Sequence, residues 1–219
     1  MSTLEKILTP PTLLETGIFR QLRSCTLARV ETTYNLIRPP FRTLKFEEMS
    51  RKELKDYKKW FLEVMPQRIE ELTRGVTNSP GFEDWTPDKT PESLNSLGHW
   101  FRSQVKTRTH TQEEWDKIPL HVKEWSSDGE LTDRTISLCM DVGMYLSQVF
   151  LRNHPALEWD QTFGSKRFID YGQPVLIGFG KTAFNPVRMV ITLAYGMAAK
   201  TKDGKRLREL YEIWSEMIG

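Results

Sequence analysis

The spacing of apolar residues predicts that most of the chain is helical. From residue 50 to residue 75, apolar side chains recur every three or four positions, which is the period of one helix face. They are Leu54, Tyr57, Phe61, Val64, Ile69 and Leu72. Ser50 and Glu53 precede them with the spacing of a capping box, so we expect the helix to start there. Pro66 lacks a backbone donor and its ring clashes with the preceding turn, so we expect the helix to break or kink there and to restart beyond it.

Signals for a helix start predict five more helices further along the chain. These helices are expected to start at Thr90, Thr111, Thr132, Asn185 and about Lys205. The side chains at the first four positions can cap a helix, and a proline directly follows Thr90 and Asn185, as is common at the first helical position. The helix after Thr132 is apolar on nearly every face up to Leu151. A helix of that kind belongs in a protein core.

Two or more strands are predicted between residues 157 and 179. Apolar and acidic residues alternate in LEWD, residues 157–160, and the apolar run PVLIGF follows at 174–179. Such patterns are typical of half-buried and fully buried strands. Residues 28–37, ARVETTYNLI, are rich in β-branched and aromatic residues and indicate a further strand. We therefore predict an α+β fold that is mainly helical, with a small β-sheet between the central buried helix and the C-terminal helices.

The chain is predicted to form one compact domain over residues 46–219, preceded by an N-terminal arm or edge segment over residues 1–45. Prolines interrupt the arm, and basic residues alternate with aromatic ones in a way that could suit nucleic acid. These residues are Arg20, Arg23, Arg29, Arg38, Arg42 and Lys45, with Phe19, Tyr34 and Phe41. The whole chain, however, carries 31 basic and 29 acidic side chains, a net charge of +2. We therefore favour an ordinary charged edge and do not expect nucleic-acid binding.

Composition also bears on the compartment. The 219 residues contain no run of 18 or more apolar positions that could span a bilayer. The first residues, MSTLEKILTPPTLLETG, lack the pattern of a signal peptide, so we expect a cytoplasmic protein without membrane contact. The two cysteines, Cys25 and Cys139, form no CxxC motif, so neither a disulfide scaffold nor a structural zinc site is predicted.

The stretch VLIGFGKTAFNP, residues 175–186, ends its glycine-containing part in Gly-Lys-Thr, like a phosphate-binding loop. Such a loop needs glycine at the position of Val175 and a helix that starts at the lysine. Here the helix signal, Asn185 and Pro186, comes too late for its amide groups to hold what the glycines approach. We predict a strand followed by an exposed loop, and no nucleotide cofactor.

An acidic pair and three regularly spaced histidines are the candidate metal ligands or catalytic groups in the sequence. Glu158 and Asp160 would share one face of a strand, where paired carboxylates can hold a proton or a cation, but the alternation with apolar residues explains them as a solvated face. His99, His110 and His121 recur every eleven residues, yet Thr111 and Pro119 interrupt any common helix. We interpret them as surface histidines and predict no metal site and no catalytic residues.

Residues 133–200 resemble a helix, strand, strand, helix module of small bacterial proteins, some of which resemble toxin-immunity proteins. The similarity lies in GMYLSQVFLRNHPALEW, GQPVLIGFG and FNPVRMV. It implies a cytoplasmic immunity protein that binds a cognate toxin and occludes its active site, which needs surface complementarity and no chemistry of its own. The alternative is a small enzyme or ligand-binding protein whose site is assembled from Glu, Asp and His residues distant in sequence.

The loops offer candidate contacts for such a protein partner. Trp85 lies in a turn-rich segment, and an exposed tryptophan is a favoured anchor at protein interfaces because it buries much area with few rotatable bonds. We predict partner contacts at Glu83, Asp84, Trp85, Lys181 and Phe184. The sequence does not determine the oligomeric state.

Overall fold

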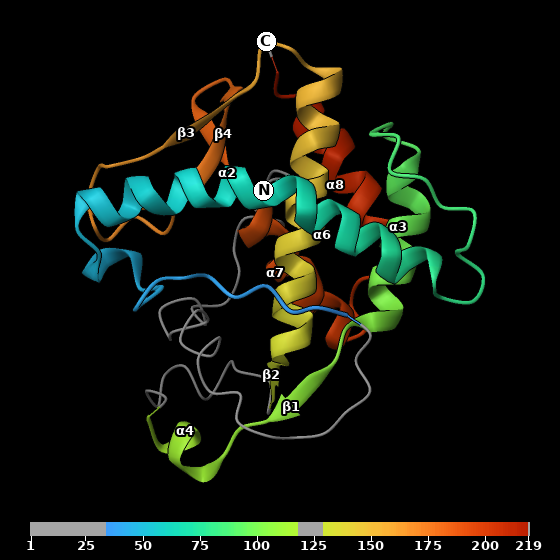
Figure 1. Ribbon diagram of the computed structural model, residues 1–219, viewed down its shortest axis with the longest axis horizontal. Coiled ribbons are helices and arrows are strands. Elements are labelled where there is room, and N and C mark those ends of the chain that lie inside the picture. The colour runs from blue at the N-terminus through green and yellow to red at the C-terminus, as the bar shows by residue number, and fades with distance from the viewer. Residues whose placement is uncertain (1–33, 118–128, 219) are drawn as a thin grey trace.

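The computed structural model describes residues 34–117 and 129–218 (Figure 1). Within these ranges it contains six α-helices and two small antiparallel sheets, which confirms the mainly helical α+β class. The elements are the 3-10 helix η3 (Phe46–Glu48), α2 (Arg51–Thr77), α3 (Ser93–Gln104), β1 (Thr107–Thr109), α4 (Gln112–Lys117), β2 (Gly129–Leu131), α6 (Asp133–Asn153), β3 (Glu158–Gln161), β4 (Pro174–Phe179), β5 (Thr182–Phe184), α7 (Pro186–Ala198) and α8 (Arg206–Ser215). No helix among the described residues is long and apolar enough to cross a membrane.

Helix α6 forms the centre of the molecule, as its all-round apolar sequence predicts. In Figure 1 it runs vertically through the middle and α2 crosses it. The side chain of Thr132 caps its first turn by accepting a hydrogen bond from the backbone N–H of Thr135 at 3.2 Å. Helices α2, α3, α7 and α8 all contact it. Gly143 lets α7 approach closely, since a Cβ there would lie 2.9 Å from the Cα of Val187.

Helix α2 begins with the predicted capping box, in which Ser50 and Glu53 satisfy each other's backbone donors. The predicted break at Pro66 is wrong, because α2 is one continuous helix through this residue. Pro66 is exposed, so water can bond the carbonyl that its ring leaves without a partner. The buried residues Phe61 and Leu72 lie on either side of it and hold both halves of the helix on the core.

The sheet predicted between residues 157 and 179 is confirmed and contains three strands in the order β3-β4-β5. Strand β5 was not predicted, because the sequence indicated an exposed loop after Gly180. Gly180 instead forms the turn of a β4–β5 hairpin with a φ of +63°. The two-stranded sheet β1–β2 was also not predicted. Both additions consist of strands of three residues, too short to show a period of two in the sequence.

The predicted boundary at residue 45 does not coincide with a break in the core. Tyr34, Ile37 and Leu44 are buried in the same cluster as the helices. The predicted strand at 28–37 is not found over residues 34–37, and its first six residues lie outside the described part of the chain. Residues 1–33 of the predicted arm are likewise outside it.

A buried polar group fixes the segment around Tyr34 to α2 and α6. Asp141, fully buried in α6, accepts hydrogen bonds from Nε and Nη2 of Arg68 at 2.8 and 2.7 Å and from the Tyr34 hydroxyl at 2.5 Å. Ser137 Oγ accepts from the backbone N–H of Ile37 at 2.9 Å. Burial raises the pKa of Asp141 to about 6, so its carboxylate is charged at neutral pH and depends on Arg68 for compensation.

Replacing Arg68 with Met should lower the free energy of unfolding by about 3–5 kcal/mol at pH 7, because the buried carboxylate of Asp141 would lose its cation. Because the pKa of Asp141 is higher in the folded state, protonation of this carboxyl favours folding. Its contribution to the free energy of unfolding is complete below the unfolded pKa, about 4, and is lost as the pH rises through about 6. The loss in Arg68→Met should therefore be smaller at pH 5, where the carboxyl can take up a proton. Urea denaturation at both pH values measures the difference.

Lys59→Met is the matched control, because the Lys59 side chain is 75% exposed and its partner Glu63 lies 3.8 Å away. This change should alter the free energy of unfolding by no more than about 0.5 kcal/mol. An Arg68→Met loss as small as that of the control would show that the buried pair does not hold the segment in place.

Candidate functional site

Two of the predicted contact residues lie in the core. Trp85 is 7% exposed, and its indole N–H donates to the backbone carbonyl of Ser93 at 3.0 Å. Its ring packs edge-on against Tyr145, with the ring centroids 5.4 Å apart. The predicted exposure of Trp85 is therefore wrong. The loop that carries Trp85 packs against the start of α3, and Tyr145 of α6 packs against the indole ring. Ser93 also pairs with the Tyr145 hydroxyl at 2.7 Å.

Phe184 is also fully buried, because β5 turns it towards the core. Its ring centroid lies 4.7 Å from that of Trp214 and 5.0 Å from that of Phe150. Of the other predicted contacts, Glu83 and Asp84 are exposed in the loop after α2, and Lys181 is exposed at the β4–β5 turn. These three residues remain available to a partner, but neither predicted aromatic anchor does.

The acidic pair and the Gly-Lys-Thr stretch between residues 158 and 186 lie on a strand face and in a turn. Glu158 and Asp160 are exposed on β3, with the half-buried ring of Trp159 between them and 5.5 Å from that of Phe61. They therefore form a solvated strand face, as expected. Lys181 lies in the hairpin turn and α7 starts only at Pro186, so the Gly-Lys-Thr stretch lacks the helix that a phosphate-binding loop requires.

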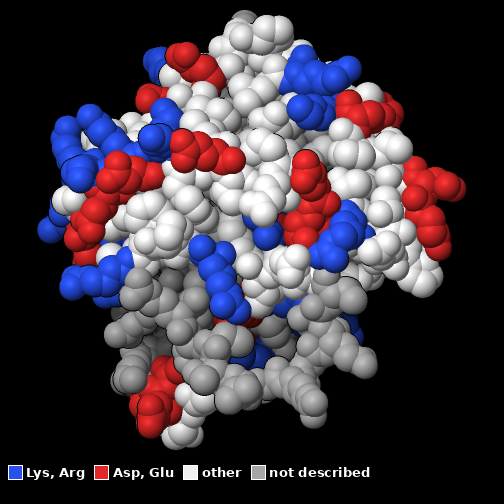
Figure 2. Space-filling model, in the orientation of Figure 1, with Lys and Arg blue, Asp and Glu red and all other residues white. Residues whose placement is uncertain are grey.

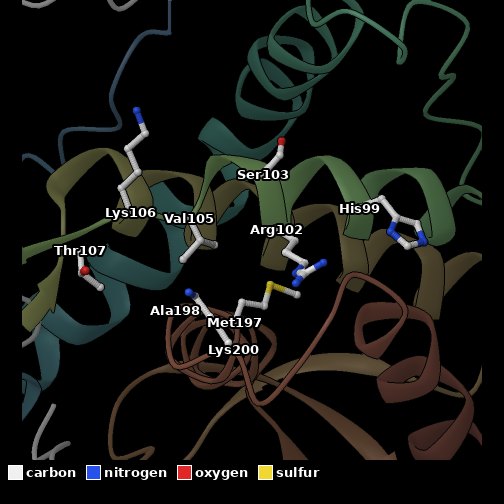
Figure 3. Close-up of a pocket in the computed structure, with 9 residues that line it drawn as sticks. All are labelled: His99, Arg102, Ser103, Val105, Lys106, Thr107, Met197, Ala198 and Lys200. Atoms are coloured by element: carbon white, nitrogen blue, oxygen red, sulfur yellow. The ribbon is translucent and has the colours of Figure 1, made fainter.

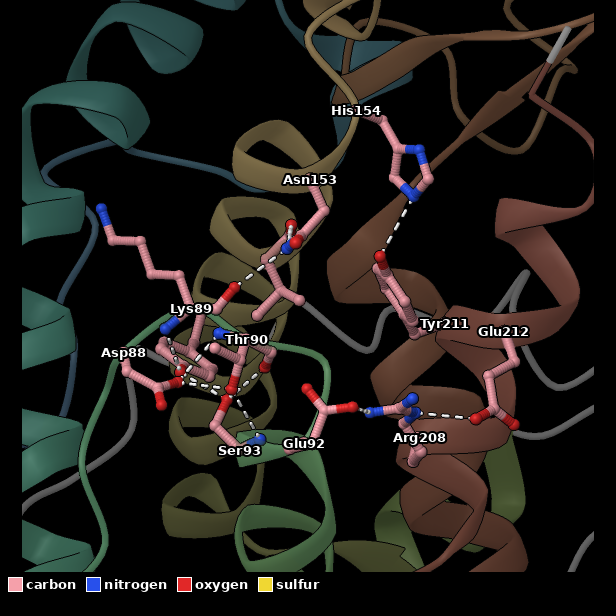
Figure 4. Close-up of polar contacts among 12 residues, drawn as sticks. Asp88, Lys89, Thr90, Glu92, Ser93, Asn153, His154, Arg208, Tyr211 and Glu212 are labelled. Carbon is pink, nitrogen blue, oxygen red and sulfur yellow. Dashed lines mark hydrogen bonds and ion pairs between the residues drawn. The ribbon is translucent and has the colours of Figure 1, made fainter.

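A seam of polar contacts fixes α8 against α6 and the start of α3 (Figure 4). His154 Nε2 lies 3.0 Å from the Tyr211 hydroxyl and 3.2 Å from Ser215 Oγ. Arg208 pairs with Glu92 at 3.0 Å. A serine beside an imidazole is also the start of a nucleophile and base pair. Here the imidazole packs against the rings of Tyr211 and Phe150, and desolvation lowers its pKa, which suits a neutral structural anchor.

A groove between the C-terminal half of α3 and the α7–α8 connection is the strongest candidate site. A hollow of about 590 Å³ adjoins a second of about 420 Å³, and Arg102 and Lys200 line both. Figure 3 shows the side chains of Arg102 and Met197 meeting between the two elements, while Ser103 and Lys106 point away from the gap. We call these joined hollows the basic groove.

Two glycines set the wall of the basic groove. A Cβ on Gly98 of α3 would lie 2.1 Å from the carbonyl oxygen of Gly204, and a Cβ on Gly204 would lie 2.6 Å from the Cα of His99. Backbone therefore touches backbone, which no other residue pair would allow. The contact brings the α7–α8 connection, with its lysines, beside Arg102.

The charge in the basic groove is unbalanced. Its basic lining residues are Arg102, Lys200, Lys202 and Arg206, with Lys106 at its edge and pointing away, and its acidic ones are Asp203 and Glu209. Glu209 pairs with Arg206, and Asp203 accepts from the backbone of Lys205 at 3.0 Å. Among the described residues, Arg102 and Lys200 form no ion pair. By contrast, basic and acidic side chains alternate over the face of the molecule in Figure 2.

Arg206 adds an unmet donor to the basic groove. Its Nε is buried and has no acceptor among the described residues. Buried polar groups in folded proteins are almost always hydrogen-bonded, and an unpaired one indicates either strain or a missing ligand. An anionic ligand in the groove would supply acceptor oxygens to the cations that line it.

Lys200 occupies a backbone conformation that normally calls for glycine. Helix α7 ends in a Schellman motif, in which Lys200 N–H donates to the Met197 carbonyl at 3.0 Å and Thr201 N–H donates to the Gly196 carbonyl at 2.9 Å. Lys200 is the residue after the C-cap and has a φ of +58°. This left-handed conformation costs a residue with a Cβ about 1 kcal/mol. The chain thus places a lysine, at a loss of stability, where it lines both hollows.

No family model matches the chain, and neither a curated protein nor a solved structure matches it. The resemblance of residues 133–200 to immunity proteins therefore stays a hypothesis from the sequence. One local signal in the sequence marks the basic groove. The run KTKDGKR, residues 200–206, places four basic residues around a glycine.

Lys200→Gly should raise the free energy of unfolding by about 0.5–1 kcal/mol, because glycine adopts a positive φ without a Cβ clash. Lys200→Ala removes the same charge but keeps the strain, so it should give no such gain. Thermal and urea denaturation of both variants measure the effect. If Lys200→Ala is stabilised as much as Lys200→Gly, the effect comes from the charge and the strain argument is wrong.

Proposed function

We propose that this protein binds an acidic surface of a partner protein through the basic groove. In the cell it acts as a cytoplasmic immunity protein that neutralises a cognate bacterial toxin by occluding the active site of the toxin. The observation that carries the binding function is Lys200, whose strained backbone places in the groove a cation that has no counter-ion among the described residues. Strain of this kind clusters at ligand sites, where stability is traded for function.

The groove supports a protein partner better than a nucleic acid. Proteins that hold single strands combine cations with aromatic platforms on which bases stack. The described lining residues include no Phe, Tyr or Trp, and the apolar part of the groove consists of Val105, Met197 and Ala198. Methionine adapts its shape to a partner's side chains, which suits a protein interface. The near-balanced charge of the whole chain also gives little long-range attraction for nucleic acid.

The toxin-neutralising role rests on the resemblance of residues 133–200 and on the groove as its contact surface. Occlusion requires only that complementary surfaces meet over the toxin's active site. Charge complementarity would speed association and select the cognate toxin among its relatives. The exposed residues Glu83, Asp84 and Lys181 stay candidate contacts at the rim.

We expect a toxin domain encoded beside this gene, and that domain should bind the full chain and lose its activity in the complex. Arg102→Glu combined with Lys200→Glu should weaken this binding by at least about 100-fold, because like charges would then face each other across the interface. Isothermal titration calorimetry at about 50 and 200 mM salt measures the affinity, which should fall as salt rises. A single-stranded oligonucleotide serves as the competing ligand and should not bind.

Two variants separate the groove from general effects. Lys59→Glu places a single charge reversal of the same sign on the exposed face of α2 and should leave affinity nearly unchanged. Lys89→Gly relieves the other positive φ of a non-glycine residue, +60°, outside the groove, so it should not weaken binding, whereas Lys200→Gly should. Unchanged toxin binding in the Arg102→Glu, Lys200→Glu variant would exclude the groove as the interface. Tight oligonucleotide binding would favour nucleic acid instead.

A further inference from the structure

One histidine and two glutamates from three different elements meet beside the β1–β2 sheet. His110 directly follows β1, Glu114 lies in α4 and Glu130 lies in β2. Each offers one ligand atom, and the three atoms lie within 4.8 Å of one another. Strand pairing places Arg108 directly opposite Glu130. Because side chains alternate along a strand, His110 is expected on the same face as Arg108 and therefore near Glu130.

The imidazole of His110 is buried and lacks a hydrogen bond on one nitrogen. Its side chain is only 5% exposed, so the predicted surface position is wrong for this histidine. Nδ1 has no hydrogen-bond partner among the described residues, and it faces Glu130 Oε1 at 3.5 Å. The ring lies beside that of Trp115, with the centroids 5.9 Å apart. A buried nitrogen aimed at a carboxylate without bonding it is unusual in a folded protein.

The separation of these atoms suits a bound metal ion. Zinc binds histidine nitrogen and carboxylate oxygen at about 2.0–2.2 Å in a tetrahedral arrangement, which places neighbouring ligand atoms about 3.4 Å apart. Nδ1 of His110 and Oε1 of Glu130 already have nearly this separation. Glu114 would close in by at most about 1.4 Å to complete the set. An imidazole with two carboxylates favours zinc-like ions over magnesium or calcium, which prefer oxygen ligands alone.

Arg108 balances the two carboxylates when no metal is bound. Its guanidinium contacts Glu114 through two nitrogens at 2.8 Å each and Glu130 at 2.8 Å. Asp133 also lies close enough to interact electrostatically with both Arg108 and Glu130. Three carboxylates thus lie near this guanidinium, and carboxylates gathered in this way attract a cation.

We propose that His110, Glu114 and Glu130 bind a divalent cation of the zinc class, with three protein ligands and one coordination position open to water or to a ligand group. The metal displaces Arg108 from the carboxylates, so the arginine and the ion compete for the same oxygens. This site lies outside the basic groove, and the proposal does not rest on a protein partner. It gives the alternative drawn from the sequence, a site assembled from Glu and His residues distant in sequence, a definite location.

Titration of the full chain with Zn²⁺ at pH 7 should give one tight site. Removing a ligand in His110→Ala should weaken zinc binding by roughly 10-fold or more, since loss even of a group that supports a ligand has such an effect. Arg108→Met should instead tighten binding by several-fold, because it removes the competing cation. His99→Ala, which changes an exposed histidine of the groove, should leave the affinity unchanged.

Cobalt provides a second readout on the unaltered chain. Co²⁺ in a four-coordinate site with a histidine ligand gives strong visible absorption, which Zn²⁺ should abolish at one equivalent. The proposal is overturned if the unaltered chain shows no such absorption and binds zinc no more tightly than His110→Ala. It is also overturned if Arg108→Met, folded by circular dichroism, binds zinc more weakly than the unaltered chain. The latter result would mean that the cluster is an ion-pair network and not a metal site.

Discussion

The fold depends on one buried helix and on the single buried charge that this helix carries. Helix α6 is covered on every face, so α2, α3, α7 and α8 each bury their apolar stripe against it. Asp141 interrupts this apolar surface, and an ionised carboxylate in such a place must be compensated. Arg68 reaches it from α2 and also donates to the Asn35 carbonyl at 2.8 Å, so one guanidinium joins α6, α2 and the segment before η3. The positions of the peripheral elements follow from this arrangement.

The sequence predicted the elements whose signals lie within one or two helical turns. Caps at Ser50, Thr132 and Asn185 are decided by hydrogen bonds to residues three positions away, and all three are present. The errors came where distant residues decide the outcome. Helix α2 continues through Pro66 because burial on both sides outweighs one lost hydrogen bond, and Trp85 is buried because Ser93 and Tyr145 accommodate it. Local propensity carries no information about either.

The candidate sites could not be predicted from the sequence either, because residues that are distant in the sequence form them. Arg102 and Lys200 are almost a hundred residues apart, and packing that includes the backbone contact between Gly98 and Gly204 brings their segments together. A Schellman motif with lysine in place of glycine also gives no local signal, because the usual glycine is what marks such a turn. In the sequence, the regular spacing of eleven residues relates His110 only to two other histidines. Its actual neighbour is Glu130, which strand pairing supplies.

The groove and the metal-ligand cluster share strand β1, and this shared strand links the two proposals physically. Thr107 lines the groove, while the next residue, Arg108, holds the carboxylates of Glu114 and Glu130. Alternation along a strand directs neighbouring side chains to opposite faces, so the two sites lie back to back. A two-stranded ribbon has little stability of its own, and β1 pairs only with β2 among the described strands. An ion that releases Arg108 would therefore act on a pliant part of the groove wall, and by linkage a partner in the groove would change the affinity for the ion by the same factor.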